Sequence, residues 1–231
     1  MEKIKKARPT GRCDQEGSFG RACPKFKTIF LGKTSPKDAR LKRLKYWCGE
    51  FHRCGLTPCY GRGSYGNFSF RVKIGSNGFI ITASGLKLKN NPKDNSFFYV
   101  ADVDMDKKEV SGYGTRLPSS ESLLHFAIYR KRKDVAAIFH GHCTELLKTA
   151  SARGIPCTFR EEPYGSPALV RSVLKILGRH KFLIMKNHGF ISLGKDMDRA
   201  GRRALLFIKN KDIITISSAP KYDLRAKRKK D

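Results

Sequence analysis

Two histidines, His140 and His142, stand two residues apart at the end of the apolar run 135–139. Successive side chains of a β-strand point to opposite faces, so residues i and i+2 project from the same side. On an α-helix, with 3.6 residues per turn, the same two side chains would diverge by about 200°. The spacing therefore predicts a strand that presents two imidazoles to one metal ion. Taken alone, the pair also fits two ordinary polar histidines.

A third histidine, His188, follows the apolar run 182–185. Three histidines that hold a metal and leave one coordination position open are the usual arrangement of a catalytic zinc site. Glu121 stands at the start of a predicted helix, whose positive end favours a negative charge. These four residues form the candidate catalytic set.

Small and hydroxyl residues near the candidate catalytic set suit a phosphate group. Ser119 and Ser120 precede Glu121 at the same predicted helix start, where free N–H groups and hydroxyls bind anions. Asn67 and Gly85 stand in predicted turns, which allow the backbone to approach a second edge of the phosphate. The alternative for the two serines and Glu121 is a plain N-terminal helix cap.

The elements that must position these residues follow from hydrophobic periodicity. Their mixed order, with several hairpins ahead of helices, fits an α+β fold or an α/β/α sandwich. We expect the sandwich, an α/β fold with a largely antiparallel mixed central sheet and helices on both faces. The predicted helices are 37–54, a segment that opens at 119–121, 144–152, 167–177 and 196–217. The predicted strands are 68–72, 79–82, 97–103, 109–113, 135–140, 182–185 and 190–193.

The chain has 231 residues, which suits one domain with extensions. We expect a basic, irregular N-terminal arm at 1–36, a single domain at 37–217 and a basic C-terminal tail at 218–231. The net charge is +28, and residues 1–46 carry 14 Lys or Arg against 4 Asp or Glu. Such an excess either marks contact with a nucleic acid or another polyanion, or belongs to solvated lysine-rich tails.

The number of cysteines and the length of the apolar runs bear on the cellular compartment of the protein. Seven cysteines are an odd number without the paired spacing of a zinc ribbon, so reduced thiols are expected. No apolar run is long enough to cross a bilayer, and no positively flanked apolar segment opens the chain. The sequence predicts a soluble, cytoplasmic protein.

Five ordered motifs resemble those of the class II aldolase/adducin-like family, whose members include aldolases of fuculose 1-phosphate. The resemblance covers about residues 38–210. Its motifs are GNFSFR at 66–71, ITASG at 81–85, LPSSE at 117–121, HGH at 140–142 and KNHG at 186–189.

The resemblance implies an α/β/α fold and a four-fold symmetric tetramer with active sites between subunits. It also implies a divalent metal, normally zinc, on His140, His142 and His188, with Glu121 as catalytic acid/base. The positions that it assigns to the substrate phosphate are Asn67, Ser84, Gly85, Ser119 and Ser120.

The implied reaction cleaves or forms a carbon–carbon bond in a ketose 1-phosphate, with dihydroxyacetone phosphate and an aldehyde as the two parts. Zinc would act as a Lewis acid and hold an enediolate, while Glu121 moves the proton next to the carbonyl. A sugar-phosphate dehydratase or epimerase is the alternative within the family. Epimerases of the family commonly carry Asp at the position of Glu121, which favours the aldolase or dehydratase. A polyanion-binding protein on the same fold is the alternative from another class.

One departure from the family pattern concerns the second proton donor. Arg160 falls where the fuculose enzymes place a catalytic tyrosine. Tyr113, Tyr164 and Tyr222 are the candidates to replace that tyrosine.

Overall fold

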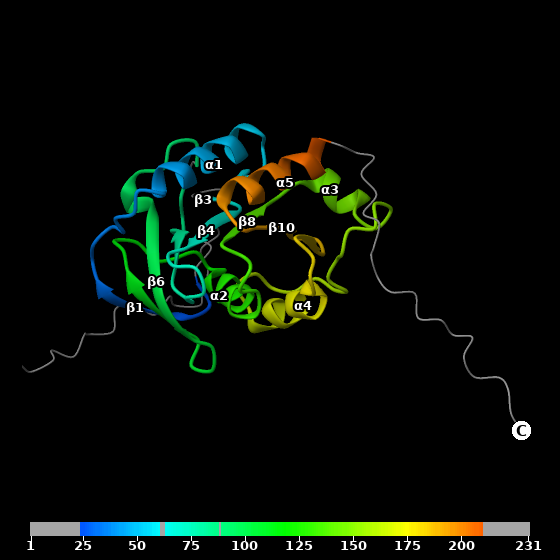
Figure 1. Cartoon of the computed structure of the whole chain (residues 1–231). Helices are drawn as coiled ribbons and strands as arrows, with labels where there is room; N and C mark the ends of the chain where they lie inside the picture. Colours follow the sequence, from blue (N-terminus) through cyan, green and yellow to red (C-terminus); the bar gives the residue numbers. More distant parts are fainter. Residues whose placement is uncertain (1–23, 61–62, 88, 210–231) are drawn as a thin grey trace, which may run out of the picture.

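The structure is a computed structural model that describes residues 24–60, 63–87 and 89–209 (Figure 1). Its centre is one eight-stranded sheet, flanked by five helices and a small two-stranded hairpin within these residues. The strands of the sheet are β1 (Lys27–Gly32), β4 (Asn67–Arg71), β5 (Phe79–Thr82), β6 (Phe97–Asp104), β7 (Glu109–Tyr113), β8 (Ala137–Gly141), β9 (Phe182–Met185) and β10 (Gly189–Gly194). The other elements are α1 (Leu41–Arg53), β2 (Cys59–Tyr60), β3 (Gly63–Ser64), η1 (Asp94–Ser96), α2 (Ser122–Lys131), α3 (Thr144–Thr149), α4 (Pro167–Leu177) and α5 (Met197–Lys209).

The strand order in the sheet is β1-β7-β6-β5-β4-β8-β10-β9. Only β1 and β7 pair in parallel, and every other pair of neighbours in the sheet is antiparallel. The predicted sheet, mixed but largely antiparallel, is therefore confirmed. Strand β8, which carries the histidine pair, lies between β4 and β10 in the interior of the sheet.

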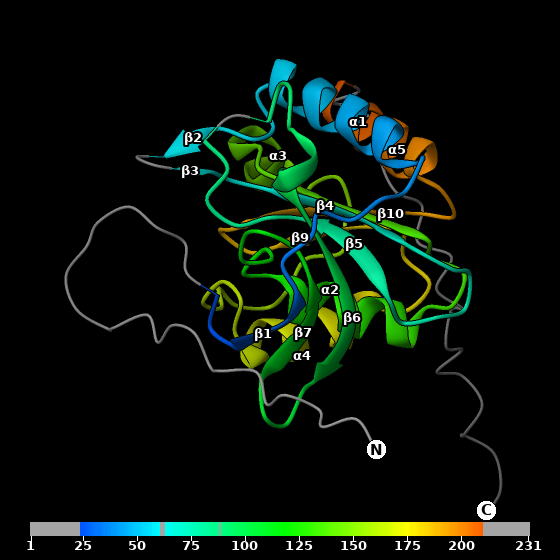
Figure 2. The ribbon, with the colours of Figure 1, turned by 90° about the vertical axis from the view of Figure 1, so that its left-hand side faces the viewer.

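Helices cover both faces of the sheet, so the predicted sandwich is also confirmed. Figures 1 and 2 show α1, α3 and α5 on one face and α2 and α4 on the other. Each face has its own apolar core, and strand β8 contributes to both by alternation. Phe139 packs under α1 and α5 with Trp47 and Phe51, whereas Ile138 packs on the side of α2 and α4.

Local sequence explains several elements well. In α1 the residues Leu41, Leu44, Trp47, Cys48 and Phe51 are buried, which is the stripe of a helix that lies on a core. Helix α4 has the bounds that the sequence predicts. Its start is fixed because the Ser166 side chain accepts a hydrogen bond from the backbone of Leu169 and a proline follows the cap.

The expected irregular arm at 1–36 was wrong for residues 27–32, which form the edge strand β1. Thr28, Ile29 and Phe30 are β-branched or aromatic and are half-buried, and the flanking lysines hid this strand from the periodicity. Residues 1–23 of the predicted arm, the tail 218–231 and the end of the predicted helix 196–217 lie outside the described residues.

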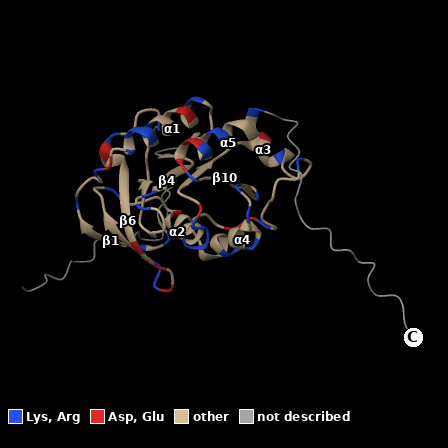
Figure 3. Ribbon diagram, in the orientation of Figure 1, with Lys and Arg blue, Asp and Glu red and all other residues tan. Residues whose placement is uncertain are grey.

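Charge on the described helices is mixed. Figure 3 shows acidic positions among the basic ones on α1 and α5, and Arg43 forms an ion pair with Asp198 at 2.5 Å between these helices. The predicted polyanion contact rests on the basic terminal segments, which lie only partly within the described residues, and it stays a prediction. None of the described helices combines the length and apolar content needed to span a membrane.

Candidate metal centre and active site

Strand β8 places the first two histidines. His140 lies two residues beyond Ile138, so its side chain emerges on the face covered by α2 and is almost fully buried. His142 lies just past the end of the strand, where its backbone N–H donates to the carbonyl of Leu56 at 2.8 Å. The Nε2 atoms of the two imidazoles are 3.0 Å apart. The spacing of the pair thus brings both rings to one point, as the sequence predicts for a strand.

The turn between β9 and β10 supplies the third histidine. Asn187 adopts a left-handed conformation, and the backbone N–H of His188 donates to the carbonyl of Met185 at 3.0 Å. Gly189 lets this turn approach β8 closely, because a Cβ there would lie 2.6 Å from the carbonyl oxygen of Gly141. Donor atoms of the three histidines all lie within 4.8 Å of one another. Within the described ranges they form the only such cluster.

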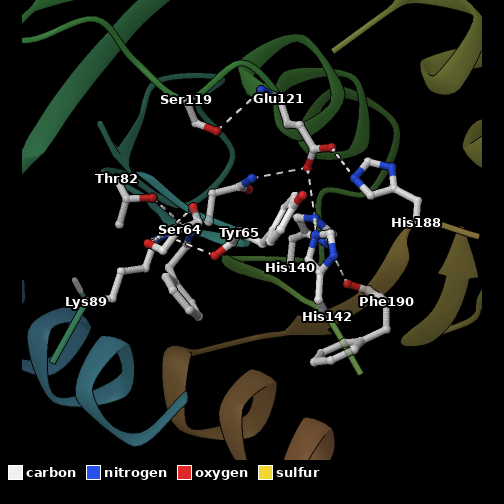
Figure 4. A network of polar contacts seen from close by, with 12 residues as sticks. Ser64, Tyr65, Thr82, Lys89, Ser119, Glu121, His140, His142, His188 and Phe190 are labelled. Carbon is white, nitrogen blue, oxygen red and sulfur yellow. Dashed lines mark hydrogen bonds and ion pairs between the residues drawn. The ribbon is translucent and has the colours of Figure 1, made fainter. Parts of the chain in front are cut away.

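Glu121 faces this cluster from the start of α2 (Figure 4). Its carboxylate is buried, with Oε1 3.2 Å from Nε2 of His188 and Oε2 3.5 Å from Nε2 of His140. The amide of Asn67 donates to Oε2 at 3.1 Å. The alternative of a plain helix cap was wrong for Glu121, because its side chain makes no capping hydrogen bond and turns to the histidines instead. The hydroxyl of Ser119 accepts from the backbone N–H of Glu121 at 3.3 Å.

Burial favours the neutral, metal-binding form of two of the imidazoles, those of His140 and His142. Burial lowers the pKa of His140, and burial together with the other two histidines lowers the pKa of His142 to about 2. The carbonyl oxygen of Phe190 lies 2.9 Å from Nδ1 of His140 and accepts its proton, which leaves the lone pair on Nε2. Burial would raise the pKa of the Glu121 carboxyl, but His140, His188 and Asn67 outweigh it and lower this pKa.

The donor set fits a divalent metal ion. Two nitrogens bound to one tetrahedral zinc at about 2.0–2.1 Å are about 3.3 Å apart, which is close to the 3.0 Å between His140 and His142. Oε1 of Glu121 is buried without a hydrogen-bond partner. Lone pairs that converge in a buried space without a donor are stabilised by a cation. Three imidazoles would leave a position open for a substrate.

A pocket opens over these residues. The expected phosphate residues all line it, on the side where β4, the end of β5 and the start of α2 meet. Gly85 has a left-handed backbone at φ 68°, as a tight turn here requires. The expected phosphate residues on the wall are Asn67, Ser84, Gly85, Ser119 and Ser120.

The tyrosine candidates for the second proton donor differ in whether they line the pocket. Tyr164 lines the pocket, whereas Tyr113 does not line it and instead stacks on Tyr99 of the neighbouring strand β6. The side chain of Arg160 is 73% exposed and is not on the pocket wall. Tyr222 lies outside the described residues.

Sequence reasoning missed several residues of the pocket wall. The ring of Tyr65 packs on that of His142, tilted by 32° with the centroids 4.6 Å apart, and Lys89 lies buried beside Tyr65. Tyr65 directly precedes the motif at 66–71, a position that could have flagged it. Nothing in the sequence around Lys89 distinguishes it from the other lysines. Acidic side chains of Glu161 and Glu162 also reach the pocket.

Comparison with known proteins agrees with the fold and identifies the family. The family described as Class II Aldolase and Adducin N-terminal domain matches residues 43–210, so the chain belongs to this family. The predicted family resemblance is confirmed.

Relatives with assigned activities act on phosphorylated sugars. The chain is 28% identical over 171 residues to the 5-methylthioribulose-1-phosphate/5-deoxyribulose-1-phosphate aldolase of Escherichia coli, covering 66% of this chain and 72% of that protein. It is also 28% identical over 200 residues to the methylthioribulose-1-phosphate dehydratase of Leptospira borgpetersenii, covering 71% and 76%. The solved structure of an L-fuculose 1-phosphate aldolase superimposes with a TM-score of 0.61 at 22% identity, over 76% of this chain and 84% of that one.

Proposed function

We propose that this chain is a metal-dependent aldolase that cleaves or forms a carbon–carbon bond in a ketose 1-phosphate. The products of cleavage would be dihydroxyacetone phosphate and an aldehyde. The observation that carries the proposal is the approach of Glu121 to the histidine cluster, 3.2 Å from His188 and 3.5 Å from His140, in a pocket with a serine-lined wall.

His140, His142 and His188 would hold the metal, for which zinc is our candidate. When bound, a divalent metal supplies a Lewis acid that polarises the carbonyl of the substrate. Glu121 then acts on the carbon next to that carbonyl, where its carboxylate removes the proton or returns it. The hydrogen bond from Asn67 fixes the orientation of this carboxylate. This chemistry needs no lysine Schiff base.

The phosphate would sit on the opposite wall of the pocket from the histidines. Ser119 and Ser120 precede α2, and Ser84 and Gly85 face them from the turn after β5, so their side chains and the glycine backbone would receive the phosphate. Asn67 lies between this wall and the carboxylate of Glu121. One substrate could therefore place its phosphate on the serines and its carbonyl at the histidines.

The proton donor to the aldehyde oxygen would be a tyrosine of the pocket. Tyr164 is the member of our expected set that lines the pocket, and Tyr65 is a second phenol on its wall. Both side chains are partly exposed, at 41% and 44%, so a substrate can reach them. A homotetramer with active sites between subunits stays part of the proposal.

A dehydratase is the second candidate, because the dehydratase relative is as identical to this chain as the aldolase relative. Aldol formation and dehydration both begin with removal of the proton next to the carbonyl, and aldol cleavage ends with the return of that proton. In the aldolase direction a carbon–carbon bond is formed or broken, whereas the dehydratase expels a neighbouring hydroxyl as water. The histidines and Glu121 serve either outcome.

The decisive experiment screens the zinc-loaded protein with dihydroxyacetone phosphate and a panel of aldehydes, and separately with 5-methylthioribulose 1-phosphate. We expect new ketose phosphates from the first screen, and Glu121→Gln to lower turnover by about a hundredfold or more with its zinc content unchanged. The matched control is Glu145→Gln, at an exposed carboxylate on α3, with turnover like the wild type. A dehydrated product with no aldol product would select the second candidate.

A further inference from the structure

Lys89 is a buried lysine in the wall of the same pocket. Its side chain is 2% exposed, and its ammonium donates to the carbonyl of Ser64 at 3.0 Å, the hydroxyl of Ser64 at 2.6 Å and the carbonyl of Tyr65 at 3.1 Å (Figure 4). All three acceptors are uncharged. Hydrogen bonds thus hold this cation in place without neutralising it.

No acidic side chain in the described part of the chain pairs with Lys89. A buried charge is expensive unless it is paired, and lysines are almost never buried alone. Burial accordingly lowers the pKa of Lys89 to about 8, and the titratable groups within its electrostatic reach are the thiols of Cys48 and Cys59 and the imidazoles of His140 and His142. Burial raises the pKa of the Cys48 thiol to about 12, so this neighbour gives the ammonium no counter-charge near pH 7.

The position of Lys89 links the two turns that form the phosphate wall. Ser64 and Tyr65 lead directly into Asn67, and Lys89 itself follows the turn at Ser84 and Gly85. Its charge also reaches the histidine cluster, where it adds to the effect of burial and of the other histidines in lowering the pKa of His142. A cation so placed acts on the anion end of the pocket and on the metal end together.

We infer that Lys89 is the charge partner and positioning residue of the substrate phosphate, so that its counter-ion arrives with the ligand. The inference rests on the proposed function, in which the substrate is phosphorylated. It names the residue that favours a phosphorylated sugar over one without phosphate. The ammonium orders the turns at Ser64 and Gly85 and attracts the phosphate dianion to the wall that they form. A sugar without the phosphate gains nothing from this charge.

The test measures binding of inorganic phosphate to the zinc-loaded full-length protein by titration calorimetry. We expect Lys89→Met to weaken binding about tenfold or more, with its zinc content unchanged. The matched control is Lys87→Met, an exposed lysine two residues earlier, with an affinity within about twofold of the wild type. An unchanged affinity in Lys89→Met, or no binding of phosphate to the wild type, overturns the inference.

A second measurement needs no variant and separates charge pairing from a structural role. In the wild type, the titration of lysine ammonium groups by nitrogen NMR should show one depressed pKa near 8. Phosphate at saturation should raise it by about one unit, because a tenfold preference for the protonated form equals one pKa unit and the coupling is reciprocal. A purely structural lysine would show no rise, which also overturns the inference.

These outcomes are independent of turnover. Phosphate binding that depends on Lys89, in a protein that converts no ketose phosphate in either screen, would reject the proposed function and keep a phosphate-binding Lys89. If the wild type is a full aldolase and Lys89→Met binds phosphate as well as the wild type does, the proposed function is kept and the inference about Lys89 is rejected.

Discussion

Oε1 of Glu121 lies 3.2 Å from Nε2 of His188, although one residue precedes α2 and the other stands in the turn between β9 and β10. Their meeting point is fixed by β8, which pairs with β10 on one side and β4 on the other. The sheet therefore brings the Glu121 carboxylate and the histidine nitrogens together, although they come from three separate parts of the chain. Asn67, at the start of β4, closes the set through its hydrogen bond to the carboxylate.

The first prediction concerns metal binding. Wild-type protein reconstituted with zinc should retain about one equivalent per chain, since the three imidazoles form one site. His140→Ala should retain less than about a tenth, because it removes the most deeply buried donor. Metal content measured by mass spectrometry checks this, with His180→Ala as the control at an exposed histidine. Equal zinc in the two variants would refute the histidine site.

The second prediction concerns Gly189. In Gly189→Ala the new Cβ would lie 2.6 Å from both the carbonyl of Gly141 and the ring of His140, so β8 and the turn must separate. Overpacking of this kind costs about 1–3 kcal/mol of unfolding free energy. We also expect zinc affinity to fall, because His140 must shift. Denaturant unfolding and zinc titration measure the two effects.

The control for that variant is Gly78→Ala, where the closest atom to the new Cβ is the hydroxyl of Tyr99 at 3.1 Å, the far end of a side chain that can move. A smaller stability loss than in Gly189→Ala, with unchanged zinc affinity, is expected. If Gly189→Ala behaves like this control, the close approach of the turn to β8 does not matter for the site.

Local patterns predicted the parts of the site that depend on spacing within one element. The pair His140 and His142 follows from the alternation of a strand, and helix α4 follows from its cap and its apolar stripe. Glu121 was also recognised as a member of the catalytic set, although its local sequence alone fits a helix cap equally well. The choice between a cap and a catalytic carboxylate depends on where the histidines arrive.

Residues whose role depends on distant segments could not be found in this way. Lys89 is buried only because the turn at Ser64 folds over it, and its local sequence contains other lysines of no such role. Strand β1 was not predicted because lysines interrupt its apolar pattern. Lys27 lies on the exposed edge of the sheet, where it forms an ion pair with Glu109 of β7 at 2.8 Å. A periodicity argument cannot see a partner strand that lies far along the chain.

The third prediction separates the ring of Tyr65 from its hydroxyl. The ring packs on His142 with centroids 4.6 Å apart, a contact worth about 0.5–1.5 kcal/mol. Tyr65→Ala should therefore weaken zinc binding by roughly two- to twelvefold, following from that energy, whereas Tyr65→Phe should keep wild-type affinity. Zinc titration against a competing chelator makes the comparison. Equal affinities in the two variants would show that the ring contact does not orient His142.

The last prediction concerns acid stability and rests on His125, which is fully buried in α2. Burial lowers its pKa from 6.5 to about 3, and its Nδ1 lies 2.7 Å from the hydroxyl of Ser69. Because the folded pKa lies below the unfolded one, the unfolded chain binds a proton that the folded chain refuses. Stability is then complete above pH 6.5 and is lost as the pH falls towards 3.

Within that window His125 should remove about 1.4 kcal/mol of unfolding free energy per pH unit. His125→Gln cannot titrate, so its stability should fall less steeply between pH 6.5 and 4.5, whatever its stability at pH 7. Urea unfolding of the metal-free forms at several pH values gives both slopes, and the exposed His180→Gln serves as the control with a wild-type slope. Parallel slopes for His125→Gln and the wild type would mean that His125 accepts its proton without unfolding.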